Sequence, residues 1–291
     1  MISWWLAAPA GGALLAGLAA GLVQRHLRPA FATGLLTLLI AAAATAVVML
    51  VTLLAAMFVA QLPAAAGRLD WCLTITRGHE VPTWLGAGAL ISLLAMGVSL
   101  RSAMRRLPAR RSAESGPLVV LPVEEPTAFA VPGRPGHVVV SKGMLRLLDG
   151  DERRVLLAHE RAHLRRHHHR YNWVASVAVA VVPPLGPVRT RIRFATERWA
   201  DEDAAGEVGD RRLVARTIAR AALAQSELVP ALALARLGVR ARVDALLNDP
   251  KGRRTGQLAA LAGLAFAIGG IASSTLQVHH VAALLGHFCR A

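Results

Sequence analysis

Charged and aromatic residues are scarce in this chain. Of its 291 residues, 18% are Asp, Glu, Lys or Arg and 4% are Phe, Trp or Tyr, while 54% are hydrophobic. The mean hydropathy is +0.45. This profile is typical of a membrane protein, because a water-exposed surface needs more charge. Nowhere are basic and aromatic residues interleaved as on a single-strand or base-reading surface, so we expect no direct nucleic-acid partner.

Lysine is nearly absent, and the positive charge comes from arginine. Lys142 and Lys251 are the two lysines in a chain whose net charge is +15. An arginine-rich segment beside a membrane more often contacts lipid headgroups and sets topology than binds nucleic acid. We therefore expect membrane lipids among the partners of this protein.

Long stretches without charge predict the membrane topology. A run of about 20 apolar residues crosses a hydrocarbon core about 30 Å thick. A cleaved signal peptide is the other interpretation of the first stretch, but no basic region precedes it and its apolar run is too long. The predicted spans are residues 4–23, 35–62, 83–100 and 258–278.

Basic residues give the predicted orientation of these spans. Five arginines between Arg101 and Arg111 follow the third span, and the 24–34 loop holds two more, whereas the 63–82 loop is neutral. Basic loops stay in the cytoplasm, so we expect a multi-pass cell-membrane protein with both termini outside. The predicted domains are 1–111 with three spans, 112–256 in the cytoplasm, and 257–291 with the fourth span and a short outer tail.

Cysteine is as rare as lysine. Cys72 and Cys289 are the two in the chain, and both lie outside on this topology, where disulfides persist. We hypothesise that they pair; two unrelated thiols at the membrane surface are the alternative. Thiol labelling that finds both cysteines free in non-reduced protein would refute the pairing. Neither shares a compartment with the cytoplasmic domain, so neither is expected to be its nucleophile or metal ligand.

Three short strands are predicted early in the cytoplasmic domain. Leu118–Val123, Ala128–Val131 and His137–Ser141 are short apolar runs, and the turn-forming segment 132–136 separates the last two. In a protease, an edge strand beside a metal-binding helix can hold the substrate backbone by strand addition. An ordinary structural hairpin is the equal alternative. The candidate substrate-binding residues are Ala128, Phe129, Ala130 and Val131.

An apolar segment inside the cytoplasmic domain, 173–188, is too short to span a membrane. Pro183, Pro184 and Pro187 interrupt it. We expect a membrane-associated or re-entrant element, because a full span would carry the residues that follow to the other side. Helices are predicted for residues 189–206 and 211–250.

One predicted helix, which begins with a capping box of Asp149 and Glu152, carries a metal-binding pattern. His159-Glu160-Arg161-Ala162-His163 is an H-E-x-x-H sequence. Residues four apart share a helix face, so both imidazoles can bind one Zn²⁺. Glu160 then lies beside the open metal position, where a base must stand to take a proton from water. The other interpretation is chance, because the chain has 11 His.

A third ligand is expected from another helix, because a catalytic zinc takes three protein ligands. The run His167–His169 starts about 12 Å from His159 along the helix, too far to share the ion, and is predicted to be solvated or headgroup-facing. Glu197 follows 34 residues after His163, which leaves room for a returning helix. Asp201, one turn later, would orient a ligand histidine. Two surface acids among arginines are the alternative.

Together these features resemble the BlaR/MecR type of integral-membrane zinc metallopeptidase. The likeness lies in the four-span topology, HERAH at 159–163, ERWAD at 197–201, and AFAVPGRPGHVVVSKGMLRLL at 128–148, a segment that also resembles HtpX-type relatives. The chain departs from the pattern at Arg161 and at His168, where an acidic residue is common. The resemblance implies a gluzincin-like site with zinc on His159, His163 and Glu197, Glu160 as general base, and Asp201 behind a ligand.

The antibiotic-sensing members of that group carry a penicillin-binding domain after the last span. The 13 residues that follow position 278 have no counterpart of it, so we expect no direct β-lactam sensing. In HtpX-type relatives, further spans usually separate the histidine pair from the third ligand, and 173–188 is too broken to supply them.

The sequence thus predicts a mainly α membrane protein with a cytoplasmic α+β zincin-like metalloprotease domain between spans three and four. By resemblance, it is a zinc-dependent metalloendopeptidase in signal transduction. Its protein substrate is then a cytoplasmic repressor of the winged-helix type, or the chain itself. The alternatives are an HtpX-type membrane quality-control protease and a non-catalytic membrane signalling or scaffold protein with a structural metal site. Homo-oligomerisation is left open.

Overall fold

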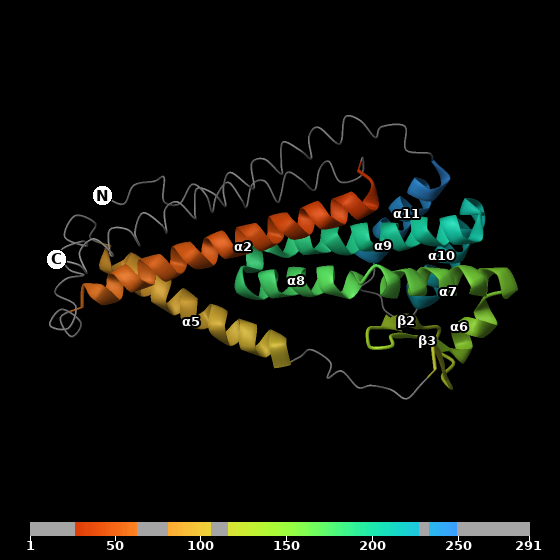
Figure 1. The fold of residues 1–291 in the computed structure, drawn as a ribbon, viewed down its shortest axis with the longest axis horizontal. Helices are drawn as coiled ribbons and strands as arrows, with labels where there is room; N and C mark the ends of the chain where they lie inside the picture. Colours follow the sequence, from red (N-terminus) through yellow and green to blue (C-terminus); the bar gives the residue numbers. More distant parts are fainter. Residues whose placement is uncertain (1–26, 63–80, 106–115, 227–232, 249–291) are drawn as a thin grey trace.

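The computed structural model describes residues 27–62, 81–105, 116–226 and 233–248. These form an elongated, mostly helical molecule with one small sheet (Figure 1). Two long apolar helices form one end, the first of them continues alongside the middle helices, and the sheet lies toward the other end (Figure 1). The predicted first and fourth spans, Cys72 and Cys289 lie outside the described residues.

Two of the described helices are long and apolar enough to cross a membrane. They are α2, Pro29–Ala60, with a mean hydropathy of 2.6, and α5, Thr83–Arg105, with 1.7. They pack against each other, with Gly86 of α5 against the ring of Phe58 in α2. α2 starts six residues before the predicted second span. α5 starts at the first residue of the predicted third span and continues five residues past its end.

The broken apolar segment forms the tip of a helical hairpin. It consists of α8, His168–Val181, a 3-10 turn (η3) at Pro183–Leu185, and α9, Gly186–Val208. The prolines reverse the chain, because proline cannot continue the preceding helix. The hairpin packs on the first half of α2 through Leu36 and Ile40. Neither α8 nor α9 is among the two candidate spans found in the described residues.

The three predicted strands are present in a sheet of order β1-β3-β2. They are β1, Leu118–Leu121, β2, Ala128–Val131, and β3, His137–Ser141, so the first is two residues shorter than predicted. β3 pairs in parallel with β1 and antiparallel with β2. β2 is therefore an edge strand.

The orientation of the β2 backbone follows from the hydrogen bonds that flank it. The N–H of Ser141 donates to the carbonyl of Thr127. In an antiparallel pair such bonds involve every second residue, so Phe129 and Val131 bond to β3. The N–H and C=O groups of Ala128 and Ala130 consequently point to the open edge.

Short helices complete the domain. α6, Lys142–Leu147, leads into α7, Gly150–Arg165, and α10, Arg211–Ser226, and α11, Ala233–Leu247, follow α9. The predicted capping box of α7 is confirmed, with Asp149 and Glu152 bonded to each other's backbone N–H. The Glu152 carboxylate is buried and also pairs with Arg220, which holds α10 against the start of α7.

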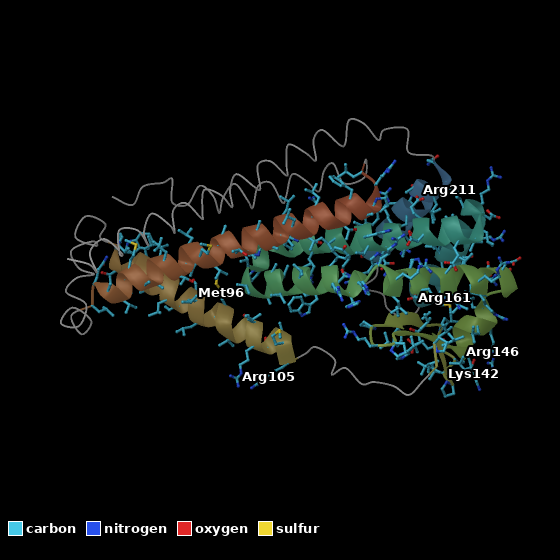
Figure 2. All side chains as sticks on the ribbon, in the orientation of Figure 1. Met96, Arg105, Lys142, Arg146, Arg161 and Arg211 are labelled. Atoms are coloured by element: carbon cyan, nitrogen blue, oxygen red, sulfur yellow. The ribbon has the colours of Figure 1, made fainter. Side chains whose placement is uncertain are left out.

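Charged side chains distinguish the two ends of the molecule. Lys142, Arg146, Arg161 and Arg211 lie around the sheet end, whereas Met96 lies along α5 between the apolar helices (Figure 2). Arg105 lies at the last turn of α5. This distribution is typical of a protein with one end in lipid and the other in water.

Gly143 provides a test of how closely α6 packs against the segment that follows β1. A Cβ at this position would meet the carbonyl oxygen of Glu124 at 1.8 Å, and neither backbone can move without disturbing the sheet. We expect Gly143→Ala to lower the free energy of unfolding by about 1–3 kcal/mol. The control is Gly150→Ala in α7, which meets nothing within 4 Å. Equal thermal unfolding temperatures for the two variants would contradict this packing.

Candidate metal centre

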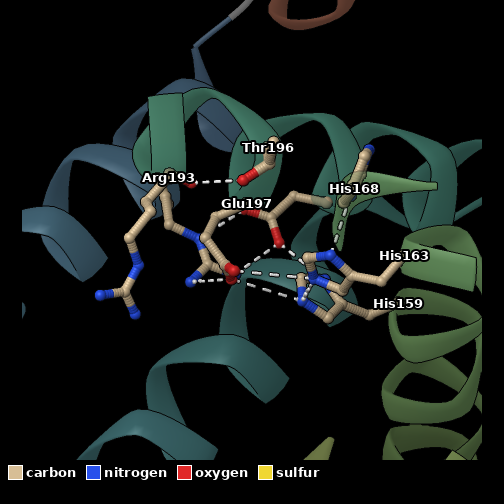
Figure 3. A network of polar contacts seen from close by, with 8 residues as sticks. His159, His163, His168, Arg193, Thr196 and Glu197 are labelled. Atoms are coloured by element: carbon tan, nitrogen blue, oxygen red, sulfur yellow. Dashed lines mark hydrogen bonds and ion pairs between the residues drawn. The ribbon is translucent and has the colours of Figure 1, made fainter. Parts of the chain in front are cut away.

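Two helices bring three metal-binding side chains together. His159 and His163 extend from one face of α7, and Glu197 reaches them from α9 (Figure 3). Their ligand atoms all lie within 4.8 Å of one another. The Nε2 atoms of the histidines are 3.2 Å apart, and each is 3.6 Å from an oxygen of Glu197. The structure thus places side by side the three residues that the sequence proposed as zinc ligands.

Asp201 lies behind the first of these histidines. Its Oδ1 is 3.0 Å from Nδ1 of His159, an ion-pair contact less well aligned than a regular hydrogen bond, and its side chain is 2% exposed. A carboxylate in this place fixes the ring of a ligand histidine and raises its basicity. The position matches the supporting role proposed from the sequence.

Arg242 of α11 completes the charge pattern, and the sequence did not reveal it. Its Nε and Nη2 each donate to a carboxylate oxygen of Asp201 at 2.7 Å, and Nη1 lies 3.1 Å from Oε2 of Glu197. Such bidentate pairs are strong and geometrically specific. Arg242 is one of 31 arginines, 45 residues after Glu197, so no local pattern distinguishes it.

The two histidines of α7 differ in charge before any metal binds. Burial would lower the pKa of His159, but the carboxylates of Asp201 and Glu197 raise it to about 10. Burial lowers the pKa of His163 to about 4. Burial would raise the pKa of Glu197, yet His159 and Arg242 hold it well below its usual range. At neutral pH one ligand carries a displaceable proton, one is neutral, and the third is an anion.

Glu160 faces the cleft beside these ligands. Its residue is 9% exposed, and burial raises the pKa of its carboxyl, an effect that the charge of His159 and the backbone of Ala130 in β2 oppose. A carboxylate with a raised pKa is better matched to taking a proton near neutral pH. Its side chain therefore connects the metal-binding helix to the edge strand.

The prediction that the His167–His169 run is solvated is wrong for its middle member. His167 and His169 are exposed, but His168 is 1% exposed. α7 ends before His167, which adopts a left-handed conformation with φ 53°. Histidine enters that region more readily than most residues. The turn directs His168 back toward His163, whose Nδ1 lies 2.8 Å from Nδ1 of His168.

A cleft of about 500 Å³ opens over the three ligands. β2 forms one wall, so Ala128, Phe129 and Ala130 of the proposed substrate strand line it, whereas Val131 does not. Its apolar part comes mostly from α7 and α10, and α7 also supplies polar groups together with α8, α9 and α11. The other lining residues include Val155, Leu156, Ile218, Ala221, Asn172, Arg193 and Arg242.

Comparison with known proteins relates this site to a family of peptidases. Residues 99–233 match Peptidase family M48. The matched segment is a little under half of the chain, and it holds β2, the H-E-x-x-H helix and Glu197, but not Arg242. M48 peptidases use zinc, and two imidazoles plus one carboxylate are the donor set of a catalytic zinc site.

The curated proteins to which the chain is similar include HtpX proteases. The chain is 34% identical over 89 residues to the Protease HtpX homolog of Aquifex aeolicus, covering 30% of this chain and 28% of that protein. It is 36% identical over 88 residues to the Protease HtpX homolog of Dictyoglomus thermophilum, covering 30% and 29%. The match thus spans less than a third of these relatives. No solved structure matches the chain.

Zinc binding should release a proton. Zn²⁺ needs the lone pair of His159, which a proton occupies below its pKa of about 10, whereas His163 is already neutral above about pH 4. We expect about one proton per zinc at pH 7–8, and affinity that falls about tenfold for each pH unit lowered there. Titration calorimetry in buffers of different ionisation enthalpy measures the number of protons released per zinc bound.

The matched variant for this measurement is Asp201→Asn. It removes the carboxylate that raises the pKa of His159, so fewer protons should be released at the same pH. Zinc binding by the wild type without proton release would contradict the described charge state of His159.

Proposed function

We propose that this protein is a membrane-anchored, zinc-dependent metalloendopeptidase of the HtpX type. The observation that carries the proposal is the convergence of His159, His163 and Glu197 beside Glu160, in a cleft bordered by a free strand edge. The similarity to Peptidase family M48 supports the same chemistry. A structural metal site would need a closed set of four ligands, and this cluster offers three.

The chain supplies the binding and proton-transfer groups of peptide hydrolysis. Zinc, when bound, supplies Lewis-acid chemistry to the scissile carbonyl and the attacking water. Glu160 takes the proton of that water and passes it to the leaving amine, and its burial provides the raised pKa that both transfers need. Arg242 and Asp201 keep Glu197 and His159 in place during these transfers.

The substrate backbone binds along β2 as an added strand. Ala128 and Ala130 present their N–H and C=O groups to the cleft rather than to β3. Their methyl groups are small, and this lets an extended peptide approach closely. The substrate class that fits is an unfolded or extended segment of protein, selected by backbone shape before side-chain identity.

The curated relatives favour the HtpX type over the repressor-cleaving BlaR/MecR type, because those matched over 68 to 89 residues are HtpX homologues. An apolar hairpin, α8 with the start of α9, lies between His163 and Glu197 and packs on the candidate span α2. The sequence argues against the HtpX type because 173–188 is too broken to supply further spans; in the described residues a packed apolar hairpin, not a pair of candidate spans, stands in that place. Misfolded membrane proteins are then more suitable substrates than a dedicated repressor.

The hairpin tip lies at the level of the membrane surface in this proposal. α2 has 32 residues, about 48 Å at 1.5 Å each, and exceeds a hydrocarbon core of about 30 Å. A core of that depth, measured from Ala60, ends near Ile40, which lies in one buried cluster with residues of the hairpin. The first half of α2 then lies on the same aqueous side as the metal centre.

Glu160→Gln tests the proposed chemistry. The amide keeps the size of the side chain but cannot take a proton, so we expect unchanged zinc content and cleavage reduced by about 10²–10⁴-fold. The measurement compares cleavage of casein or of an unfolded membrane protein by the detergent-solubilised full chain. Comparing the proteins of cells that hold the wild type or this variant then identifies natural substrates.

The matched control is Glu207→Gln on α9, an exposed carboxylate that pairs with Arg165. It should cleave like the wild type. Full activity of Glu160→Gln, or a wild type that binds no zinc, would refute the enzyme. A fragment of a transcriptional repressor appearing only with the wild type would instead favour the BlaR/MecR type.

Ala130→Pro tests strand addition. Proline removes the outward N–H of the edge strand, which also opposes the raised pKa of Glu160, and leaves the hydrogen bonds of Phe129 and Val131 to β3 intact. We expect KM to rise about fivefold to tenfold for an extended peptide, the worth of one hydrogen bond, with zinc affinity unchanged. Ala130→Val keeps the N–H and is the control; equal KM values for the two variants would argue against substrate pairing on β2.

A further inference from the structure

The second ligand histidine, His163, has another histidine as its hydrogen-bond partner. His163 directs Nε2 toward the metal position, 3.2 Å from Nε2 of His159, and directs Nδ1 away from it. Nδ1 lies 2.8 Å from Nδ1 of His168, whose ring stands nearly perpendicular at a centroid distance of 4.8 Å. The first ligand histidine instead has the Asp201 carboxylate behind it. His159 is thus supported by a carboxylate anion, whereas His163 is supported by the imidazole of His168.

The geometry fixes where the protons lie. When Nε2 of His163 binds a metal, its ring proton must be on Nδ1. That N–H donates to His168, so Nδ1 of His168 is the acceptor and the proton of His168 is on Nε2. Two imidazole nitrogens at 2.8 Å hold one proton between them. His168 is therefore a neutral acceptor whose tautomer is set by metal binding.

His168 is held firmly in this position. Its residue is 1% exposed, and its ring packs against the indole of Trp199 at a centroid distance of 5.0 Å. The left-handed turn at His167 directs it back to α7. A side chain that is this buried and this fixed has little freedom to turn away from His163.

The outer nitrogen of His168 is buried, as is one polar atom of Asn172. The Nε2 of His168 and the Oδ1 of Asn172 are both buried without a hydrogen-bond partner among the described residues. The two residues lie four apart on α8 and share a helix face. Both line the cleft.

We propose that His168 is a positioning residue for the metal: it accepts the Nδ1 proton of His163 and so sets the orientation and basicity of that ligand. It acts through His163 and does not touch the metal or the substrate. Because the acceptor is neutral, His163 is the less electron-rich ligand, and the site carries one negative charge fewer than a site with two carboxylate partners. The inference rests on the zinc site of the proposed function but not on peptide cleavage.

The test compares His168→Phe with His168→Asn. Phenylalanine fills the same space without an acceptor, whereas the asparagine amide oxygen stands near the place of the lost Nδ1. We expect His168→Phe to weaken zinc binding 10–100-fold and His168→Asn to recover most of that loss. Zinc affinity is measured by chelator competition on the full chain in detergent, in a Glu160→Gln background that prevents self-cleavage.

Two further measurements separate positioning from folding. The metal-free unfolding temperature of each variant should stay near that of the parent, and the visible absorption of the Co²⁺ form should change in His168→Phe alone. His167→Asn, at an exposed neighbour that tolerates the left-handed turn, is the matched control and should bind zinc like the parent.

The outcomes decide between the two proposals. Equal zinc affinity in His168→Phe and the parent overturns the positioning role, as does a His168→Asn variant that folds normally but binds as weakly as His168→Phe. Zinc binding by a wild type that cleaves no protein counts against the proposed function alone.

Discussion

The buried ion network around Asp201 holds the metal centre together. One guanidinium, from Arg242, contacts two carboxylates of α9, and both of these also contact histidines of α7. Three helices are joined at this point. Because a buried carboxylate without its partner is costly, the network is stable only when all members are present. The geometry of the metal ligands therefore depends on a residue of α11 that has no part in the chemistry.

Small residues allow the helices to approach closely enough for this network. Ala158 of α7 and Ala204 of α9 are buried in one cluster. With these short side chains at the helix contact, Asp201 reaches His159 and Glu197 reaches the histidine pair. The same helices are joined farther out by Arg166, which pairs with Asp203 and stacks over Trp199. Packing thus sets the distances, and the charges set the orientation.

The features that the sequence revealed depend on local patterns. The capping box, the spacing of the two histidines and the strands on either side of 132–136 all lie within a few residues of one another. Glu197 and Asp201 could be proposed because they share a helix face and follow the motif closely enough for a return crossing. The topology of the first and last spans and the pairing of the two cysteines stay predictions.

The features that the sequence did not reveal depend on contacts between segments that lie far apart in the chain. Arg242 is distinguished by its contacts alone. The sequence predicts a solvated or headgroup-facing run at His167–His169; the left-handed His167 instead turns His168 back toward α7. For 173–188 the sequence predicts a membrane-associated or re-entrant element; the prolines end α8 and allow a tight reversal into α9, and the place of this hairpin relative to the membrane stays a prediction.

The first half of α2 determines whether the metal-site end can fold without the long apolar helix. Leu36, Leu39 and Ile40 lie on a helix apolar enough for lipid, yet they are buried against α8 and α9 of the catalytic end. In the proposed function, the helix is an anchor along one part of its length and a core element along the other. Cutting the chain between these two parts would remove one wall of the interior around the metal centre. The proposed catalysis and the proposed membrane attachment would then depend on one folding unit, and loss of the anchor would be a loss of fold before it was a change of location.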